Sequence, residues 1–194
     1  VAKHQEILTP ELKEAGNVLV TFELPKDEYD LPEYEEVMAL YAALHTMIVG
    51  GTLKSAYSVD AKGIVAATAK MAFGNKLGVA YDESLSVEDL FANGIGNIVA
   101  EVPADKLGDI TVTYKKVGTV TESGFTYKDV TVSEEDALAS WTSKLEKVFP
   151  TKAVKETTPV NTGLYDTKDI YVCKNKVARP TVFIPVFPGT NCEY

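Results

Sequence analysis

Short β-branched runs alternate with longer stretches of helical periodicity along most of this chain, which restricts it to folds that pack helices against a sheet. Strands are predicted at residues 17–24, 53–59, 77–81, 97–102, 109–120 and 125–132. Helices are predicted at residues 32–49, 62–75, 86–91 and 133–149, with a short helix or turn at 104–107. Because helices separate the early strands and the last two strands form an antiparallel end, we expect an α+β fold: an α/β sandwich with a mixed sheet and packed helices.

The spacing of apolar residues predicts the face that each helix buries. In the first helix, residues at spacings of three and four are Tyr34, Val37, Met38, Tyr41, Leu44 and Ile48. In the Ala-rich second helix, the predicted buried side carries Ile64, Val65, Thr68 and Met71. In the last helix, the residues expected to face inward are Leu138, Trp141, Leu145 and Val148.

Charge and cysteine content exclude some functions and favour one compartment. The 194 residues carry a formal net charge of -9, and no cluster of five or more Lys or Arg occurs, so a nucleic-acid surface is not expected. The apolar runs are shorter than a membrane-spanning helix, so no membrane contact is expected. The two cysteines, Cys173 and Cys192, form no Cys-x-x-Cys pattern, and a reducing cytoplasm therefore fits the sequence best.

Composition changes along the chain predict three segments. Residues 1–150 hold the predicted α/β domain, and residues 151–180 are polar with little periodicity, as expected of a connector between domains. Residues 181–194 begin with the apolar run Thr181–Phe187, which is typical of a buried strand, and continue into a Pro-Gly turn. A lone strand and turn predict the truncated start of a further domain, so we expect this chain to be a piece of a longer protein.

The turn between the second strand and the Ala-rich helix is the predicted ligand site. A helix N-terminus exposes unpaired N–H groups and a partial positive charge, which suits an anionic ligand such as phosphate. Ser58 and Asp60 lie in this turn, and Gly63 would allow close approach of a ligand or of another backbone segment. We predict these three as substrate- or phosphate-binding residues. The alternative is that Asp60 only caps the helix and Gly63 only allows packing.

Several segments resemble known purine-biosynthesis domains. The segments 69–74 (AKMAFG), 77–79 (LGV) and 90–95 (LFANGI) resemble the C-terminal-type domain of aminoimidazole ribonucleotide synthetase, which recurs in formylglycinamide ribonucleotide amidotransferase (phosphoribosylformylglycinamidine synthase). Residues 186–194 (VFPGTNCEY) resemble the first strand and turn of the class I glutaminase domain of the same enzyme. In that turn the matching residues are Gly189, Asn191 and Cys192. The two signatures occur in the order in which the family places these domains.

The resemblance implies a ligase that uses ATP, Mg²⁺ and glutamine to convert formylglycinamide ribonucleotide to formylglycinamidine ribonucleotide in de novo purine biosynthesis. The family's glutaminase nucleophile lies further along than Cys192, so we predict no catalytic residue and no metal site in this chain. The chain also departs from the family turn, since Tyr57 and Ser58 stand where His and Asp are usual, and only Gly63 keeps its identity. The isolated chain is therefore expected to be inactive and to hold no cofactor; the alternative is a non-catalytic module for interdomain docking.

The expected partners follow from the same resemblance. They are the other domains of the parent chain, namely a nucleotide-binding synthetase domain and the glutaminase domain. An unpaired apolar strand at 182–186 would expose an edge that invites association. We therefore expect this strand to pair within its own domain, to pair with another copy in a homodimer, or to be disordered.

Overall fold

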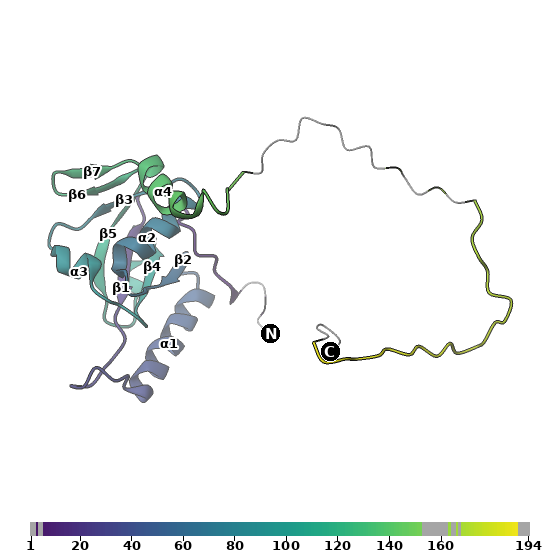
Figure 1. Cartoon of the computed structure of the whole chain (residues 1–194). Coiled ribbons are helices and arrows are strands. Elements are labelled where there is room, and N and C mark those ends of the chain that lie inside the picture. Colours follow the sequence, from purple (N-terminus) through teal and green to yellow (C-terminus); the bar gives the residue numbers. More distant parts are fainter. Residues whose placement is uncertain (1–2, 4–5, 153–162, 164–165, 167, 190–194) are drawn as a thin grey trace. The chain divides into compact units, whose positions relative to one another are not determined.

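The computed structural model describes residues 3, 6–152, 163, 166 and 168–189 (Figure 1). The chain divides into two units, Val1–Lys152 and Ala153–Tyr194. The helices and strands of the described residues all belong to the first unit, which we call the main unit.

The main unit is built on a mixed sheet of seven strands in the order β2-β4-β1-β5-β3-β6-β7 (Figure 1). The strands are β1 (Val18–Phe22), β2 (Ser55–Ser58), β3 (Gly78–Tyr81), β4 (Ile98–Val102), β5 (Lys115–Thr121), β6 (Phe125–Tyr127) and β7 (Val130–Val132). Neighbouring strands are antiparallel except for β3 and β6, which are parallel. At the centre, β1 pairs with β4 in a register that places Val18 opposite Val102.

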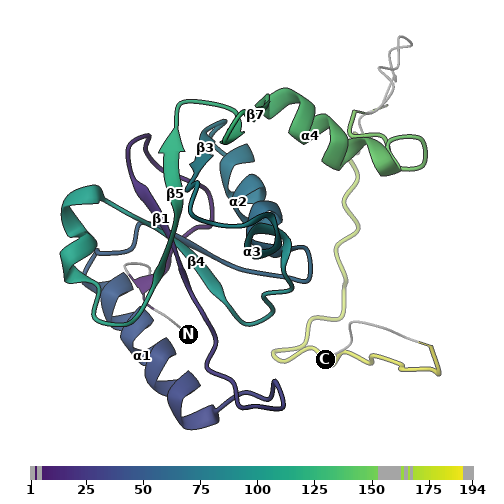
Figure 2. The ribbon, with the colours of Figure 1, turned by 90° about the vertical axis from the view of Figure 1, so that its left-hand side faces the viewer.

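Helices cover both faces of this sheet (Figure 2). They are α1 (Tyr34–Val49), α2 (Gly63–Phe73), α3 (Val87–Phe91) and α4 (Glu134–Thr142), with short 3₁₀ segments η2 (Ala104–Asp109) and η3 (Ser143–Leu145). Because side chains alternate along a strand, β1 contributes Leu19 to the core beneath α2 and α3, and Val20 to the core beneath α1. The sheet is therefore buried on both sides, and the predicted α+β class with a mixed sheet is confirmed.

The predicted buried face of α1 was partly wrong. Tyr34 and Met38 are 76% and 68% exposed, whereas the buried positions are Leu40, Leu44 and Met47. The buried stripe of α1 therefore differs from the predicted one. Long aliphatic side chains of the last turns fill the core, while the tyrosines at the N-terminal end of the helix remain near solvent. The prediction for α2 was better, since Ile64, Thr68 and Met71 are buried there and Val65 is half-buried.

The inward face predicted for the last helix was wrong. Trp141, Leu145 and Val148 are 55%, 63% and 70% exposed, and only Leu138 is half-buried. The α-helix ends at Thr142 and continues as η3, so its apolar stripe leaves the sheet instead of running along it. Trp141 and Leu145 line a surface groove beside α2, which is described below.

Two strand predictions also needed correction. β5 begins at Lys115 rather than at residue 109, because residues 104–109 form the 3₁₀ segment η2. The predicted strand at 125–132 is a hairpin of β6 and β7, in which Tyr127 pairs with Val130. Lys128 turns the chain with a φ of 52°, a left-handed conformation that breaks the apparent alternation of the sequence. The antiparallel pairing expected between the last two predicted strands was wrong, because β3 lies between β5 and β6.

In the second unit, the described residues form no helix or strand. Thr181–Phe187, predicted as a buried strand, adopts no strand, and its large apolar side chains are exposed, with Phe183 at 86% and Ile184 at 72%. A β-strand requires a neighbour to complete its backbone hydrogen bonds, so apolar β-branched residues alone do not produce one. Gly189 does lie in a turn, with a φ of 94°, whereas Asn191 and Cys192 lie outside the described residues.

A buried carboxylate joins the N-terminal segment to the centre of the sheet. Glu101 of β4 is fully buried and accepts hydrogen bonds from the backbone N–H groups of Lys13 and Glu14, at 2.8 and 3.1 Å. It also accepts from Asn17 Nδ2 at 2.7 Å and from Ser55 Oγ at 2.8 Å. Four donors on one carboxylate replace the water that a buried charge would lose, so this group fixes residues 13–17 against the sheet.

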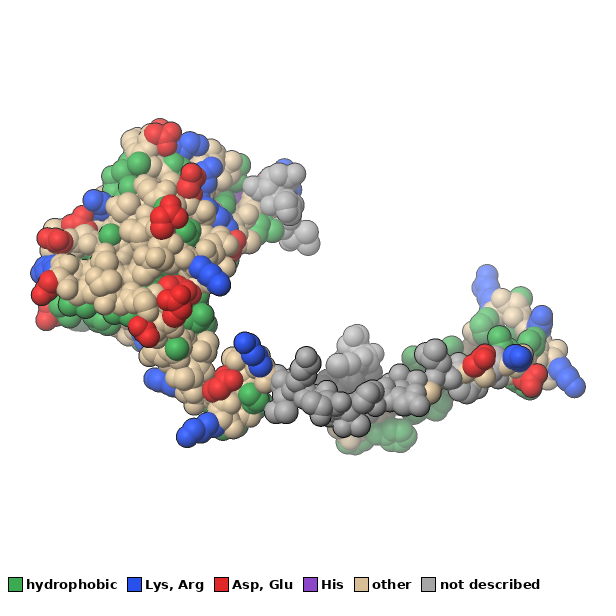
Figure 3. Space-filling model, turned by 90° about the horizontal axis from the view of Figure 1, so that it is seen from above, with side chains coloured by type: hydrophobic (Ala, Val, Ile, Leu, Met, Phe, Trp, Pro, Cys, Tyr) green, Lys and Arg blue, Asp and Glu red, His purple; other side chains and the backbone are tan. Residues whose placement is uncertain are grey.

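The surface of the main unit carries mixed charge. On the face shown in Figure 3, acidic and basic side chains are interspersed rather than gathered in patches of one sign. Among the described helices, none is long and apolar enough to cross a bilayer.

Candidate functional site

Of the three predicted site residues, Asp60 lies in the turn between β2 and α2, Gly63 begins α2, and Ser58 is the last residue of β2. Ser58 is exposed at the end of β2, where it pairs with Ile98 of β4. Asp60 places its carboxylate at the helix N-terminus, where Oδ1 accepts from the Lys62 N–H at 2.7 Å and Oδ2 accepts from Lys70 Nζ at 2.9 Å. The Lys70 ammonium and the Lys62 N–H hold the pKa of Asp60 below its ordinary value.

Gly63 is required by the backbone path of this turn. Its φ is 79°, in the left-handed region that favours glycine, and its N–H donates to the Asp60 carbonyl at 3.1 Å. A Cβ at this position would lie 2.6 Å from the carbonyl oxygen of Leu90 and 2.7 Å from Phe91. The close approach is therefore to the backbone of α3, as the packing interpretation of Gly63 expects.

A polar pocket of about 150 Å³ opens beside this turn, and we call it the Thr21 pocket. Its lining comes from β1, the start of α2, the segment around α3 and the start of β5: Thr21, Glu23, Ile64, Leu85, Asp89, Ala92, Asn93, Gly94, Asn97 and Lys115. The Thr21 side chain is 2% exposed, and its hydroxyl has no hydrogen-bond partner among the described residues. Because a buried hydroxyl is costly to leave unpaired, this position favours a polar guest, whether water or ligand.

Hydrogen bonds connect the Thr21 pocket to the turn after β2. The Gly94 N–H donates to the Asp60 carbonyl at 3.3 Å, and the Val59 N–H donates to the Asn97 carbonyl at 2.9 Å. Asn97 also accepts from the Leu24 N–H through Oδ1 at 2.8 Å. The amide of Asn97 is thus held in place by its oxygen, and its nitrogen is left as a donor near the pocket.

Two carboxylates and one ammonium group line the Thr21 pocket, and all three already have partners within the chain. Lys115 Nζ lies 2.6 Å from Glu23 Oε1, and this contact raises the pKa of Lys115. Asp89 is occupied by the capping box of α3, since it accepts from the Ser86 N–H and hydroxyl. With one lysine against two carboxylates, the pocket suits a small uncharged polar group better than a free anion.

Sequence reasoning found the turn but missed the Thr21 pocket. The available signal was the single polar residue inside the apolar run VLVTF of β1. Asn97 and Lys115 carry no such signal, because their convergence depends on the strand order of the sheet. Whether Ser58, Asp60 and Gly63 bind a ligand stays a prediction, as does the role of Gly189, Asn191 and Cys192.

Metal ligands do not gather in this site. Within the described part of the chain, no group of three His, Cys, Asp or Glu side chains is arranged to hold a metal ion. The carboxylates nearest the turn are already paired, Asp60 with Lys70 and Glu23 with Lys115. The described residues therefore do not fit a Mg²⁺ site.

Comparison of the backbone with solved structures identifies the fold. It is similar to phosphoribosylformylglycinamidine synthase II from Thermotoga maritima, with a TM-score of 0.58 and 15% identity over 84% of this chain. The chain shares the fold of part of that synthase. PurLQS from Thermotoga maritima gives the same TM-score and identity, and Thermotoga maritima PurL complexed with ATP gives 0.57 and 16% over 81% of this chain. No protein-family model and no curated protein matches the sequence.

The matched region is only part of each neighbour. This chain covers 31% of the synthase II structure and 30% of the ATP complex. At this level of identity the likeness shows the fold alone.

Proposed function

We propose that this chain is a synthetase-type domain of a phosphoribosylformylglycinamidine synthase, an ATP- and glutamine-dependent ligase that converts formylglycinamide ribonucleotide to its amidine in purine biosynthesis. The observation that supports this most is the likeness of its backbone to almost a third of synthase II. The segments 69–74, 77–79 and 186–194, which resemble the same enzyme, support it independently of the backbone.

In this proposal the main unit forms one wall of the synthetase half, residues 151–180 are the connector, and residues 181–194 are the start of the glutaminase domain. ATP and Mg²⁺ belong to a nucleotide-binding partner domain, because the described residues do not fit a Mg²⁺ site. The chain acts in the cytoplasm, and its partners are the other domains of the parent. The apolar side chains of residues 182–186 are exposed, and pairing within their own domain or with another copy in a homodimer would cover them.

Two measurements test this proposal. The purified 194-residue chain is expected to show no glutaminase and no ATPase turnover, and measurable turnover would show that the chemistry has been misplaced. The coding sequence downstream of Tyr194 is expected to continue into a glutaminase with a cysteine nucleophile and its His and Glu partners. A reading frame that continues into an unrelated domain would refute the assignment.

A non-catalytic docking module is the second candidate, and the turn after β2 favours it. The Lys62 N–H already donates to Asp60, and Gly63 packs against the α3 backbone, so the start of α2 is filled by the chain itself. Titration of the ¹⁵N-labelled chain with inorganic phosphate separates the two roles. Saturable shifts of the Lys62 and Gly63 amides support a phosphate site, whereas unchanged amides support docking alone.

A further inference from the structure

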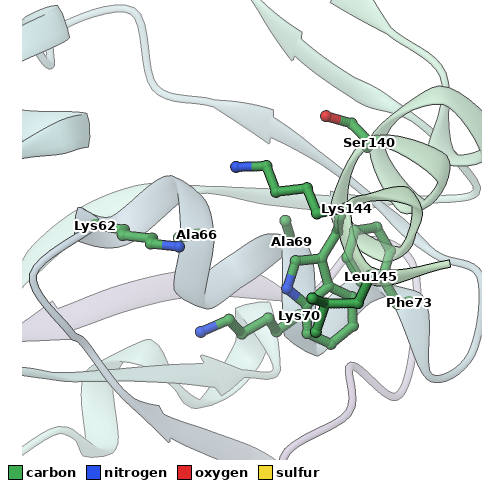
Figure 4. A pocket seen from close by; sticks show the side chains of 10 residues that line it. Lys62, Ala66, Ala69, Lys70, Phe73, Ser140, Lys144 and Leu145 are labelled. Carbon is green, nitrogen blue, oxygen red and sulfur yellow. The ribbon is translucent and has the colours of Figure 1, made fainter. Parts of the chain in front are cut away.

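A groove of about 490 Å³ lies between α2 and the α4–η3 segment, away from the Thr21 pocket (Figure 4). Its floor is apolar, with Ala69 and Phe73 from α2 facing Trp141 from α4. The volume falls within the range of about 300 to 1,000 Å³ that is usual for small-molecule sites. Trp141 and Leu145 of the predicted apolar stripe of the last helix line this groove.

An aromatic platform forms one end of the groove. The Trp141 indole stacks on the Phe73 ring, with centroids 5.5 Å apart and planes inclined by 21°. Phe73 is itself held edge-on by Phe125 of β6, at 6.3 Å and 85°. Phe73 covers one side of the indole, and Trp141 is still 55% exposed, so part of the indole surface is accessible to a second ring.

Three ammonium groups border the same groove. They belong to Lys62, Lys70 and Lys144, whose side chains line the groove (Figure 4). No Asp or Glu lines the groove, although the whole chain carries a net charge of -9. Lys70 is paired with Asp60 at 2.9 Å, whereas Lys62 and Lys144 form no ion pair with any described residue.

We propose that this groove binds a small aromatic anion: a flat ring stacked on Trp141, carrying a phosphate or carboxylate that Lys62 and Lys144 reach. Ring stacking on an indole and charge-assisted hydrogen bonds to two ammonium groups supply complementary parts of the recognition. Neither part is sufficient alone, because a single stack or an exposed charge pair is weak. The proposal does not rest on the proposed ligase function, although Lys70 of the groove is paired with Asp60 of the turn after β2.

Trp141 is the single tryptophan of the chain, so its fluorescence reports on the groove directly. With excitation at 295 nm, titration of the full 194-residue chain with adenosine 5′-monophosphate is expected to give saturable quenching, with a dissociation constant of about 1 mM or lower. Adenosine, which has the ring only, and inorganic phosphate, which has the anion only, are expected to bind at least about tenfold more weakly. Added salt weakens the mononucleotide binding but not the binding of adenosine.

Two lysine variants provide the matched test. Lys144→Gln removes a groove ammonium and is expected to weaken mononucleotide binding about tenfold while leaving adenosine unchanged. Lys147→Gln removes an exposed ammonium that does not line the groove, and it is expected to bind as the native chain does. Both exchanges are on the surface, and circular dichroism checks that the fold is retained.

Any one of several results would overturn the proposal. These are the absence of saturable quenching by the mononucleotide, equal losses in Lys144→Gln and Lys147→Gln, and equal binding of adenosine and the mononucleotide. Quenching by an acidic aromatic peptide without any by the mononucleotide would also overturn it, because the groove would then be a protein-docking surface. None of these results depends on ligase activity, so they leave the proposed function to its own tests.

Discussion

Replacement of Glu101 is expected to destabilise the main unit more than almost any other single exchange on the sheet. Glu101→Ala removes the acceptor of four hydrogen bonds, two from the backbone N–H groups of Lys13 and Glu14 and two from the side chains of Asn17 and Ser55. The two side-chain contacts are fully buried, whereas the backbone contacts are partly buried and water can replace them in part. The loss therefore depends mainly on the buried donors.

The magnitude follows from the cost of unpaired donors. An unsatisfied buried donor costs roughly 1–3 kcal/mol, so two buried donors and a partial contribution from the backbone give about 4 kcal/mol for Glu101→Ala. Glu101→Gln keeps the shape but turns one oxygen into an NH₂ group. In one orientation of this amide, Ser55 can accept from the NH₂, but the Lys13 N–H is left facing a donor. We expect this variant to lose about 2 kcal/mol.

Urea unfolding followed by far-UV circular dichroism measures both losses. With a denaturant slope of about 2 kcal/mol per molar, the midpoint is expected to fall by about 2 M in Glu101→Ala and by about 1 M in Glu101→Gln. The exposed turn residue Glu122 provides the control, since Glu122→Gln is expected to stay within about 0.5 kcal/mol of the native chain.

Hydrogen exchange provides a second readout, because the Lys13 and Glu14 amides are expected to lose protection in both variants of Glu101. A loss below about 1 kcal/mol in Glu101→Ala would refute the reasoning. It would mean that the four donors find other partners when the carboxylate is removed. Unchanged protection at residues 13 and 14 would lead to the same conclusion.

Three further exchanges test other parts of the main unit. Gly63→Ala is expected to lower the free energy of unfolding in urea by about 2–4 kcal/mol, because it strains a φ of 79° and crowds the α3 backbone. A variant that unfolds at the same urea midpoint as the native chain would contradict this. Burial raises the pKa of Tyr81 to about 12, so the contribution of Tyr81 to the free energy of unfolding is present below pH 10 and is lost as the pH rises from about 10 to 12. In Tyr81→Phe the free energy of unfolding is expected to fall less steeply over that interval. An equally steep fall in the variant would exclude this cause. Asp82 has a pKa of about 2, because it accepts hydrogen bonds from the Ser84 hydroxyl and N–H and pairs with Lys116. Its contribution to the free energy of unfolding is therefore present above about pH 4 and is lost as the pH falls through 2. Asp82→Asn is expected to unfold with a shallower acid dependence, and an unchanged acid profile would assign the effect to other carboxylates.

The order of helices and strands was predictable because it depends on local spacing. The helix predicted at residues 86–91 forms as α3, and Ser86 and Asp89 make a capping box at its start. The buried side of α2 was also predictable, since its small and apolar residues keep one spacing throughout. These features are decided by residues that lie a few positions apart.

Features that depend on distant neighbours could not be predicted in this way. The apolar stripe of the last helix was visible, but nothing local shows that Trp141 stacks on Phe73 beside a groove instead of entering the core. The Thr21 pocket needs β5 next to β1, and Glu101 needs the N-terminal segment to return to the sheet. Likewise, residues 181–187 have the composition of a strand, but a strand depends on a neighbour elsewhere in the fold.

The position of β1 at the centre of the sheet has a consequence for how the protein assembles on the ribosome. β1 emerges first, yet both of its neighbours, β4 and β5, are synthesised only after α1, β2, α2, β3 and α3. β1 therefore has no neighbouring strand, and its apolar side chains stay unpacked, while most of the main unit is translated at about 5–20 residues per second. We expect nascent chains that stop before β5 to be captured by chaperones, and release to coincide with the exit of Thr121 from the ribosomal tunnel.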